Sequence, residues 1–209
     1  MHERCSTWLF ECRRDGENGS LLILFFAIAF VGLFLTGCAS APFTGNEART
    51  QATALRQQLV DLGSDVDKDE ATRLAETALS ESAALAREYH AVRPAWFHNM
   101  LVNWGVRPRG LCYEWTNDLF PILYQLNARS LELHLAVSKM DTPHEHNCIV
   151  VTARQQSFNE GVILDAWRQS GRLWFGPVVS DKKHSWRPLP RDRVDAELEK
   201  FMPPAQGNP

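Results

Sequence analysis

The chain has 209 residues, and its 44% content of apolar residues is enough for a hydrophobic core of ordinary size. It carries 22 lysines and arginines against 25 acidic residues, a net charge of −3. This balance excludes the strongly basic surface typical of nucleic-acid-binding proteins, so we expect no nucleic-acid partner. The sequence has no internal repeat or long low-complexity tract, which excludes repeat architectures.

The N-terminal segment is predicted to be an export signal. Residues 21–35, LLILFFAIAFVGLFL, form an apolar run interrupted only by Gly32, and Arg13 and Arg14 precede it. A charged region followed by a short apolar region is typical of export signals, whereas the run is marginal for a membrane span. The alternative is a signal anchor that stays uncleaved.

The apolar run ends in the sequence LTGC, residues 35–38. This motif resembles the cleavage site of bacterial lipoprotein signals. The resemblance implies that residues 1–37 are removed and that acyl chains are attached to Cys38. Several acyl chains on one residue are sufficient as an anchor, so a membrane is the expected partner of Cys38. Ala39 follows the cysteine, and the same resemblance then places the protein at the outer membrane, facing the periplasm.

The next segments predict a tether and two helices. Residues 38–47 are small, polar and turn-prone, as flexible tethers are. Residues 48–62 and 68–92 are rich in alanine, leucine, glutamate and arginine, and their apolar residues recur at helical spacing. We therefore expect a helical N-terminal element over residues 48–93.

The start of the second helix has two interpretations. Residues 65–76, DVDKDEATRLAE, place acidic residues where a calcium-binding loop has them, but Glu70 stands where such loops need glycine for a sharp turn. Asp67 or Asp69 can instead cap the N-terminus of the helix. We favour the capped helix.

Residues 94–209 predict an α+β domain, because helices come first and a series of strands follows. Pro121 lies inside the second of these helices and should kink it. The strand segments alternate in polarity or are dense in β-branched residues, which favours a largely antiparallel meander. The expected helices are 95–105, 111–128 and a closing helix at 190–202, and the expected strands are 131–137, 146–153, 161–167 and 172–179.

Three residues of this domain form a candidate catalytic set. Cys112 lies at the predicted start of a helix, where free backbone N–H groups and the helix dipole stabilise a thiolate and can hold an oxyanion. His146 begins a predicted strand, and Asp165 lies near the end of the next strand. If these strands pair, the histidine and aspartate lie side by side. A nucleophile, a base and a group that orients the base are what thiol catalysis requires.

The sequence Gly110-Leu111-Cys112 at a helix start, followed by His146 and then Asp165 on successive strands, resembles the transglutaminase-like branch of the papain-like cysteine enzymes. The resemblance covers residues 96–186. It implies a transglutaminase-like fold, with Cys112 as nucleophile, His146 as base and Asp165 as the group that orients it. It implies no cofactor, and a peptide, peptidoglycan or protein as substrate.

A second oxyanion donor is expected shortly before the nucleophile. Asn103 and Trp104 precede Cys112 and carry side-chain N–H groups, so we regard both as candidates.

The cysteines leave an alternative open. Cys5 and Cys12 precede the cleavage site and Cys38 is the predicted lipidation site, so Cys112 and Cys148 remain. Cys148 follows His146 by two residues and shares its strand face. An exported compartment permits a Cys112–Cys148 disulfide, and Cys112 as an inert core thiol is a further alternative.

The histidines of the same region raise the question of a metal site. His144 and His146, with Cys148 or His134, could bind zinc, but the sequence DTPHE at 141–145 predicts a turn that directs His144 to solvent. No second ligand pair with zinc spacing is present, so we expect no metal. A non-catalytic interaction module at the outer membrane is the alternative function of the whole protein.

Overall fold

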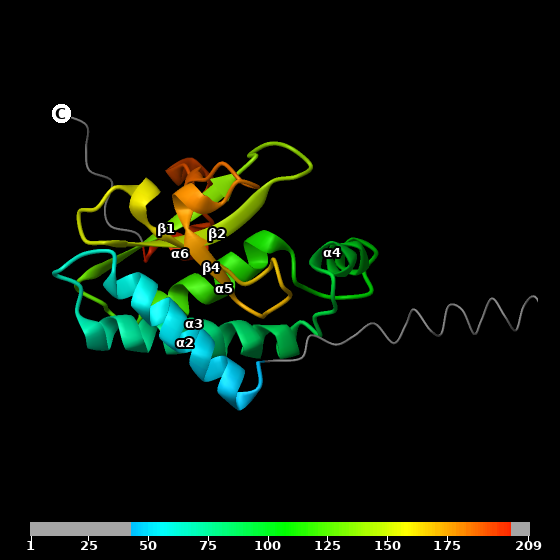
Figure 1. Cartoon of the computed structure of the whole chain (residues 1–209). Coiled ribbons are helices and arrows are strands. Elements are labelled where there is room, and N and C mark those ends of the chain that lie inside the picture. The colour runs from blue at the N-terminus through cyan, green and yellow to red at the C-terminus, as the bar shows by residue number, and fades with distance from the viewer. Residues whose placement is uncertain (1–42, 202–209) are drawn as a thin grey trace, which may run out of the picture. The chain divides into compact units, whose positions relative to one another are not determined.

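The computed structural model describes residues 43–201 of the chain (Figure 1). These residues form helices and a five-stranded antiparallel sheet, which confirms the α+β class. The predicted signal, Cys38 and most of the predicted tether lie outside the described residues. Within residues 43–201, no helix is both long and apolar enough to cross a membrane.

The two predicted N-terminal helices are α2 (Gly45–Val60) and α3 (Lys68–Glu88). Helix α2 begins within the segment expected to be tether. Helix α3 is capped as predicted, because a side-chain oxygen of Asp67 accepts hydrogen bonds from the backbone N–H groups of Asp69 (2.8 Å) and Glu70 (2.9 Å). The acidic residues here therefore start a helix.

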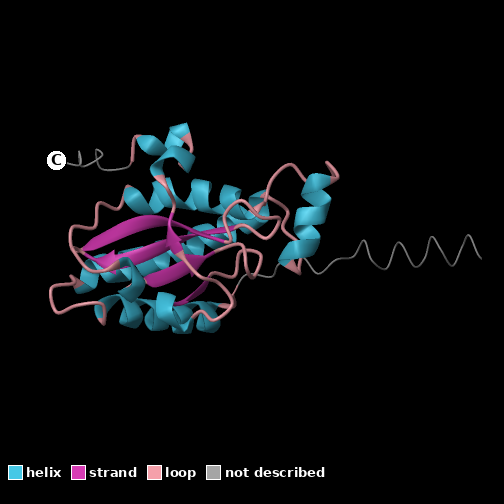
Figure 2. Cartoon of the chain, turned by 90° about the horizontal axis from the view of Figure 1, so that it is seen from above, coloured by secondary structure: helices cyan, strands magenta, loops and turns pink. Residues whose placement is uncertain are grey.

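Helices α2 and α3 belong to the same core as the sheet. Leu55 and Leu59 of α2, and Leu74 and Ala78 of α3, are buried in one hydrophobic cluster with residues of the sheet. The described residues, 43–201, therefore belong to one compact unit that contains both helices and the sheet. In Figure 2 the helices flank the strands.

Two more helices lead into the sheet. Helix α4 (Ala95–Asn103) is short, and α5 (Cys112–Tyr124) continues through Pro121. Helix α5 buries one face, with Trp115, Leu119 and Leu123 in the main cluster. Its first residue is Cys112, as the sequence predicts, so the thiol lies where the helix begins.

The sheet has the strand order β4-β3-β2-β1-β5, and all its neighbours are antiparallel. The predicted strands are present, with a short fifth strand at the edge. Their bounds are β1 (Leu131–Ser138), β2 (His146–Ala153), β3 (Val162–Asp165), β4 (Trp174–Pro177) and β5 (Arg187–Pro188).

Each face of the sheet carries its own hydrophobic cluster, as strand alternation requires. Ile149 and Val151 of β2 join the main cluster on the helical side. Cys148 and Val150 join a smaller cluster on the other side, which also contains Trp186. His146 and Asp165 lie at strand positions that share this second face.

The closing helix expected at 190–202 is largely absent from the described part of the chain. Residues Arg191–Arg193 form a single 3₁₀ turn, and α6 is only Ala196–Glu199. The physical reason is Asp195, whose side chain accepts a hydrogen bond from the N–H of Glu197 and starts the helix at this point.

Candidate active site

The loop before Cys112 is fixed by the first turn of α5. One carboxylate oxygen of Glu114 accepts hydrogen bonds from the backbone N–H groups of Gly110 (2.7 Å) and Leu111 (2.9 Å). The indole N–H of Trp115 donates to the carbonyl of Gly110 (2.9 Å). These bonds hold residues 110–111 against the helix, so the position of Cys112 is set by the backbone on both sides of it.

His98 of α4 also supports this loop. Its Nδ1 accepts from the N–H of Val92 (3.4 Å), so the proton lies on Nε2, which donates to the carbonyl of Arg109 (2.9 Å). Burial, together with the charge of Arg107, lowers the pKa of His98 and keeps the ring neutral. His98 is therefore a structural residue of the loop that carries Gly110.

Cys112 occupies the N-terminus of α5 and is partly exposed. Its Sγ lies 3.6 Å from the carbonyl oxygen of Glu145, the residue before His146. The first N–H groups of a helix have no acceptor within the helix, and at α5 these belong to Cys112 and Tyr113. The thiol thus lies beside donors suited to negative charge.

His146 and Asp165 are hydrogen-bonded across neighbouring strands, with 2.7 Å between Nε2 and Oδ2. Pairing of β2 with β3 puts both side chains on one face, as the sequence predicts. The other ring nitrogen, Nδ1, is buried and has no hydrogen-bond partner among the described residues. The imidazole is thus held by the carboxylate at one end and has a free nitrogen at the other.

The charges of the site favour a protonated imidazole. Burial alone would lower the pKa of His146, but the charge and hydrogen bond of Asp165, together with the Cys112 thiol beside the ring, raise the pKa to about 9. Asp165 is fully buried, and burial would raise its pKa, yet His146 and Arg168 lower it. At neutral pH the structure therefore favours a cationic histidine bonded to an ionised aspartate.

Arg168 connects this pair to a second carboxylate. Its backbone N–H and its Nε each donate to Asp165 at 2.9 Å, and a terminal nitrogen donates to Asp181 at 2.7 Å. The guanidinium lies 3.8 Å from the centre of the Trp174 ring. The planar guanidinium group of Arg168 is held between two carboxylates and an aromatic ring, so it has little conformational freedom. Arg168 therefore fixes the position of Asp165.

Three aromatic rings surround the imidazole. The centre of the His146 ring lies 4.7 Å from Trp167, 5.1 Å from His184 and 5.3 Å from Trp186. The indole N–H of Trp186 donates to Asp181 at 3.0 Å. Burial, with the charges of His146 and Arg168, lowers the pKa of His184, so this second histidine is neutral. Together the rings exclude water from the His146–Asp165 pair.

The residues that surround the His146–Asp165 pair are not marked by any motif in the sequence. Nothing in the sequence alone places Arg168, Asp181 or His184 beside His146 and Asp165. The sequence does indicate one of these contacts, because Arg168 follows Asp165 by only three residues and is therefore close enough along the chain to pair with it. Asp181, His184 and Trp186 belong to the segment after β4, and only the fold brings them to β2 and β3.

The two predicted oxyanion residues lie elsewhere. Asn103 and Trp104 are exposed at the end of α4. Within residues 43–201, neither Asn103 nor Trp104 forms a hydrogen bond with Cys112, His146 or Asp165. A nearer polar residue of this helix is Asn99, whose Oδ1 accepts from the indole N–H of Trp167 (2.8 Å) and links α4 to the ring that covers His146.

Cys112 and Cys148 are both free thiols, so the disulfide between them is not formed. Cys148 is fully buried in the second cluster, and burial raises its pKa well above the ordinary value. Cys112 belongs to neither cluster. Of the two thiols, only Cys112 combines partial exposure with a helix N-terminus.

The geometry gives no support to a zinc site. His144 is exposed in the β1–β2 turn, and His134 is hydrogen-bonded to Thr152 (2.9 Å). Across residues 43–201 no group of three or more His, Cys, Asp or Glu side chains is arranged to hold a metal ion.

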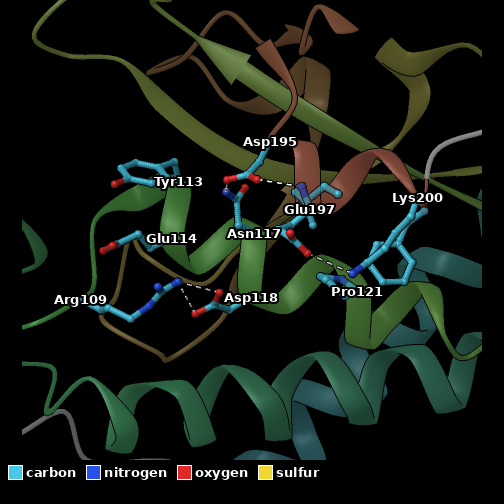
Figure 3. Close-up of a pocket in the computed structure, with 11 residues that line it drawn as sticks. Arg109, Tyr113, Glu114, Asn117, Asp118, Pro121, Asp195, Glu197 and Lys200 are labelled. Carbon is cyan, nitrogen blue, oxygen red and sulfur yellow. Dashed lines mark hydrogen bonds and ion pairs between the residues drawn. The ribbon is translucent and has the colours of Figure 1, made fainter. Parts of the chain in front are cut away.

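A pocket of about 440 Å³ lies between α5 and the residues in and around α6 (Figure 3). Tyr113, which directly follows Cys112, lies at one end. Arg109 and Asp118 are paired across the pocket at 2.7 Å. Cys112, His146 and Asp165 do not line it. The lining residues are Arg109, Tyr113, Glu114, Asn117, Asp118, Pro121, Asp195, Glu197, Leu198, Lys200 and Phe201.

Comparisons of the chain with protein-family models, with curated proteins and with solved structures find no match.

Proposed function

We propose that the protein is a lipid-anchored thiol hydrolase or acyltransferase of transglutaminase-like type in the bacterial cell envelope, at the outer membrane facing the periplasm. The observation that carries the proposal is the position of His146, whose Nε2 lies 2.7 Å from Asp165 Oδ2 and whose pKa is also raised by the thiol of Cys112, the first residue of α5. The order of Cys112, His146 and Asp165 along the chain agrees with the sequence resemblance. The position of Cys112 at the start of α5 and the pairing of β2 with β3 agree with it as well.

In this proposal the Cys112 sulfur attacks the carbonyl carbon of an amide. A carbon–sulfur bond forms, and the negative charge that develops on the carbonyl oxygen is received by the free N–H groups at the start of α5. When the carbon–nitrogen bond breaks, protonated His146 gives its proton to the leaving amine. Water or a second amine then attacks the thioester carbon and loses a proton to His146. The carbon–sulfur bond breaks, which releases the acyl product and returns the Cys112 thiolate beside protonated His146.

The substrate class in this proposal is a peptide, a peptidoglycan stem or a protein side chain. Each of these offers an amide or a primary amine to the thiol. The pocket beside Tyr113 is a suitable place for the part of the substrate that flanks the amide, because it combines aromatic, cationic and anionic side chains.

The burial of His146 favours a second candidate function. Only 3% of this residue is exposed, and Trp167, His184 and Trp186 cover its ring. A fully covered pair of this kind also suits a rigid, non-catalytic interaction module at the outer membrane.

A thiol-reactive probe separates the two functions. In the enzyme, Cys112 of the folded protein labels rapidly at neutral pH, and His146→Ala slows this labelling at least tenfold, because the cation beside the sulfur is lost. His144→Ala is the matched control, since this exposed residue lies two positions away, and it should label as the wild type does. Slow labelling that is indifferent to His146 would support the interaction module.

The anchor is tested independently. Cys38→Ser should abolish incorporation of a fatty-acid analogue and leave an uncleaved precursor, while Cys112→Ser should leave both unaffected. Equal incorporation into the wild type and Cys38→Ser would contradict the lipoprotein proposal.

A further inference from the structure

Helix α4 and the residues that follow it carry large hydrophobic side chains that are more than half exposed to solvent. Trp96, Trp104 and Val106 are 61%, 67% and 56% exposed. Trp96 and Met100 of α4 and its C-cap residue Trp104 follow one another at intervals of four residues, a spacing that places them on one side of the helix. The opposite face carries buried His98, which holds the loop before Cys112. In Figure 1 α4 stands beside the body of helices and strands.

The Asp, Glu, Lys and Arg residues of the chain segment that carries this surface have one sign. Residues 89–113 contain three arginines and no acidic residue. Arg109 is paired with Asp118, whereas Arg93 and Arg107 lie at the two ends of α4, next to the exposed tryptophans. Tryptophan and arginine together suit the interface of a membrane, where indole rings enter the headgroup region and guanidinium groups meet lipid phosphates.

The described chain begins at the same part of the molecule. The loop after β3 contacts both regions: Arg172 lies over the ring of Phe43 (4.3 Å), Ser170 donates to the carbonyl of Val92 (3.0 Å), and Trp167 donates to Asn99 of α4 (2.8 Å). Phe43 is five residues from Cys38, and five extended residues span at most about 18 Å. Acyl chains on Cys38 would therefore hold this end of the protein close to a bilayer.

We propose that the surface formed by Trp96, Met100, Trp104 and Val106, which we name the α4 surface, docks on an anionic lipid bilayer. The inference rests on the proposed anchor at Cys38 and extends it, because acyl chains alone fix only the distance from the membrane. Docking of the α4 surface fixes the orientation of the protein. Because His98 connects α4 to the loop before Cys112, the thiol then faces substrates held at the membrane surface.

The test uses the full-length protein, purified from bacterial membranes and placed in vesicles of phosphatidylethanolamine and phosphatidylglycerol. Mass spectrometry first establishes whether Cys38 is acylated, so that failure of the anchor is seen separately. Lipids with brominated acyl chains then quench the fluorescence of tryptophans in the interface. We expect quenching of the wild type to exceed that of Trp96→Ser/Trp104→Ser by at least about twofold, because both rings lie in the headgroup region.

Val179→Ser is the matched control, since Val179 is equally exposed but lies outside the α4 surface, and its quenching should equal that of the wild type. Melting curves verify that each variant is folded, and Trp104→Ser alone is used if the double variant is not. Acylated wild type with no more quenching than the tryptophan variant would overturn the proposal. Self-association of Cys38→Ser protein that Trp104→Ser abolishes would also overturn it, because a second copy would then cover the α4 surface.

Discussion

His98 and Gly110 lie so close together that a Cβ on Gly110 would overlap the ring nitrogen Nε2 of His98. Gly110 also has a φ of +125°, a conformation that side chains rarely permit. The glycine of the Gly110-Leu111-Cys112 sequence is thus required by the contact between His98 and the loop before Cys112.

Gly110→Ala should accordingly lower the free energy of unfolding by about 2–4 kcal/mol, from overpacking against His98 and from backbone strain. Urea unfolding measures this change, and Cys112 labelling should slow at the same time. Gly45→Ala is the control, because no atom lies within 4 Å of its new Cβ and its backbone is helical, so stability should change little. A stable, fully reactive Gly110→Ala protein would contradict the assigned role of this contact.

Arg168 should matter to both stability and reactivity. Arg168→Met leaves two buried carboxylates, Asp165 and Asp181, without their shared cation, and the expected cost is about 3–5 kcal/mol of unfolding free energy. Arg168→Lys keeps the charge but loses the planar guanidinium group, so it should be more stable than Arg168→Met, while Cys112 should label more slowly than in the wild type.

Arg187→Met is the control for this prediction, because Arg187 is exposed on edge strand β5. The pH profile of Cys112 labelling distinguishes positioning from simple loss of folding. If Arg168 holds Asp165 against His146, the rise of Cys112 labelling with pH should move to higher pH in folded Arg168→Lys, because a histidine that loses its proton more easily stabilises the thiolate less. An unchanged profile and rate in this variant would assign Arg168 to stability alone.

The protonation of His146 predicts a dependence of stability on pH. The folded pKa of about 9 lies above the ordinary value near 6.5, so the folded state holds this proton more tightly than the unfolded chain. The resulting stabilisation is complete below about pH 6.5 and is lost as the pH rises through about 9, at a cost on the order of 1–3 kcal/mol. Asp165 acts oppositely: its pKa is lowered, so its contribution is lost in acid.

Urea unfolding of the wild type, His146→Gln and His144→Gln between pH 6 and 9 measures this effect. The wild type and His144→Gln should lose stability in parallel, while His146→Gln should lose less over the same interval. His184 is neutral in the folded state because its pKa is lowered, so it does not contribute to a loss on the alkaline side. Identical curves for all three proteins would contradict the raised pKa of His146.

The two free thiols should respond differently to substitution. Cys148→Ala removes a buried sulfur from the second cluster and should cost about 1–2 kcal/mol, with the same melting temperature in the presence and absence of reductant. Cys112→Ser lies at a partly exposed helix start and should cost less than about 1 kcal/mol while abolishing labelling. Equal large losses in both variants, present only without reductant, would indicate a disulfide.

Features that depend on local periodicity can be predicted from the sequence. Alternation over residues 131–137 and 146–153 predicts strands, and the structure has β1 and β2 there. The same alternation puts His146 and Asp165 on one face once β2 and β3 pair. Asp67 is identifiable as a cap because capping needs only the next few residues. The start of α5 at Cys112 follows from the turn-rich residues before it.

Features that join distant segments depend on tertiary packing. His98 has a structural role because the packing of α4 brings its ring into contact with Gly110, which comes twelve residues later in the chain. Arg168, Asp181, His184 and Trp186 form one network around His146 because the chain after β4 returns over the second face of the sheet, and no local pattern encodes that path. Asn103 and Trp104 are near Cys112 in sequence but are directed outward, because the buried face of α4 is already occupied by Ala95 and His98. Sequence proximity fixes the length of chain between two residues, whereas packing fixes the direction in which their side chains point.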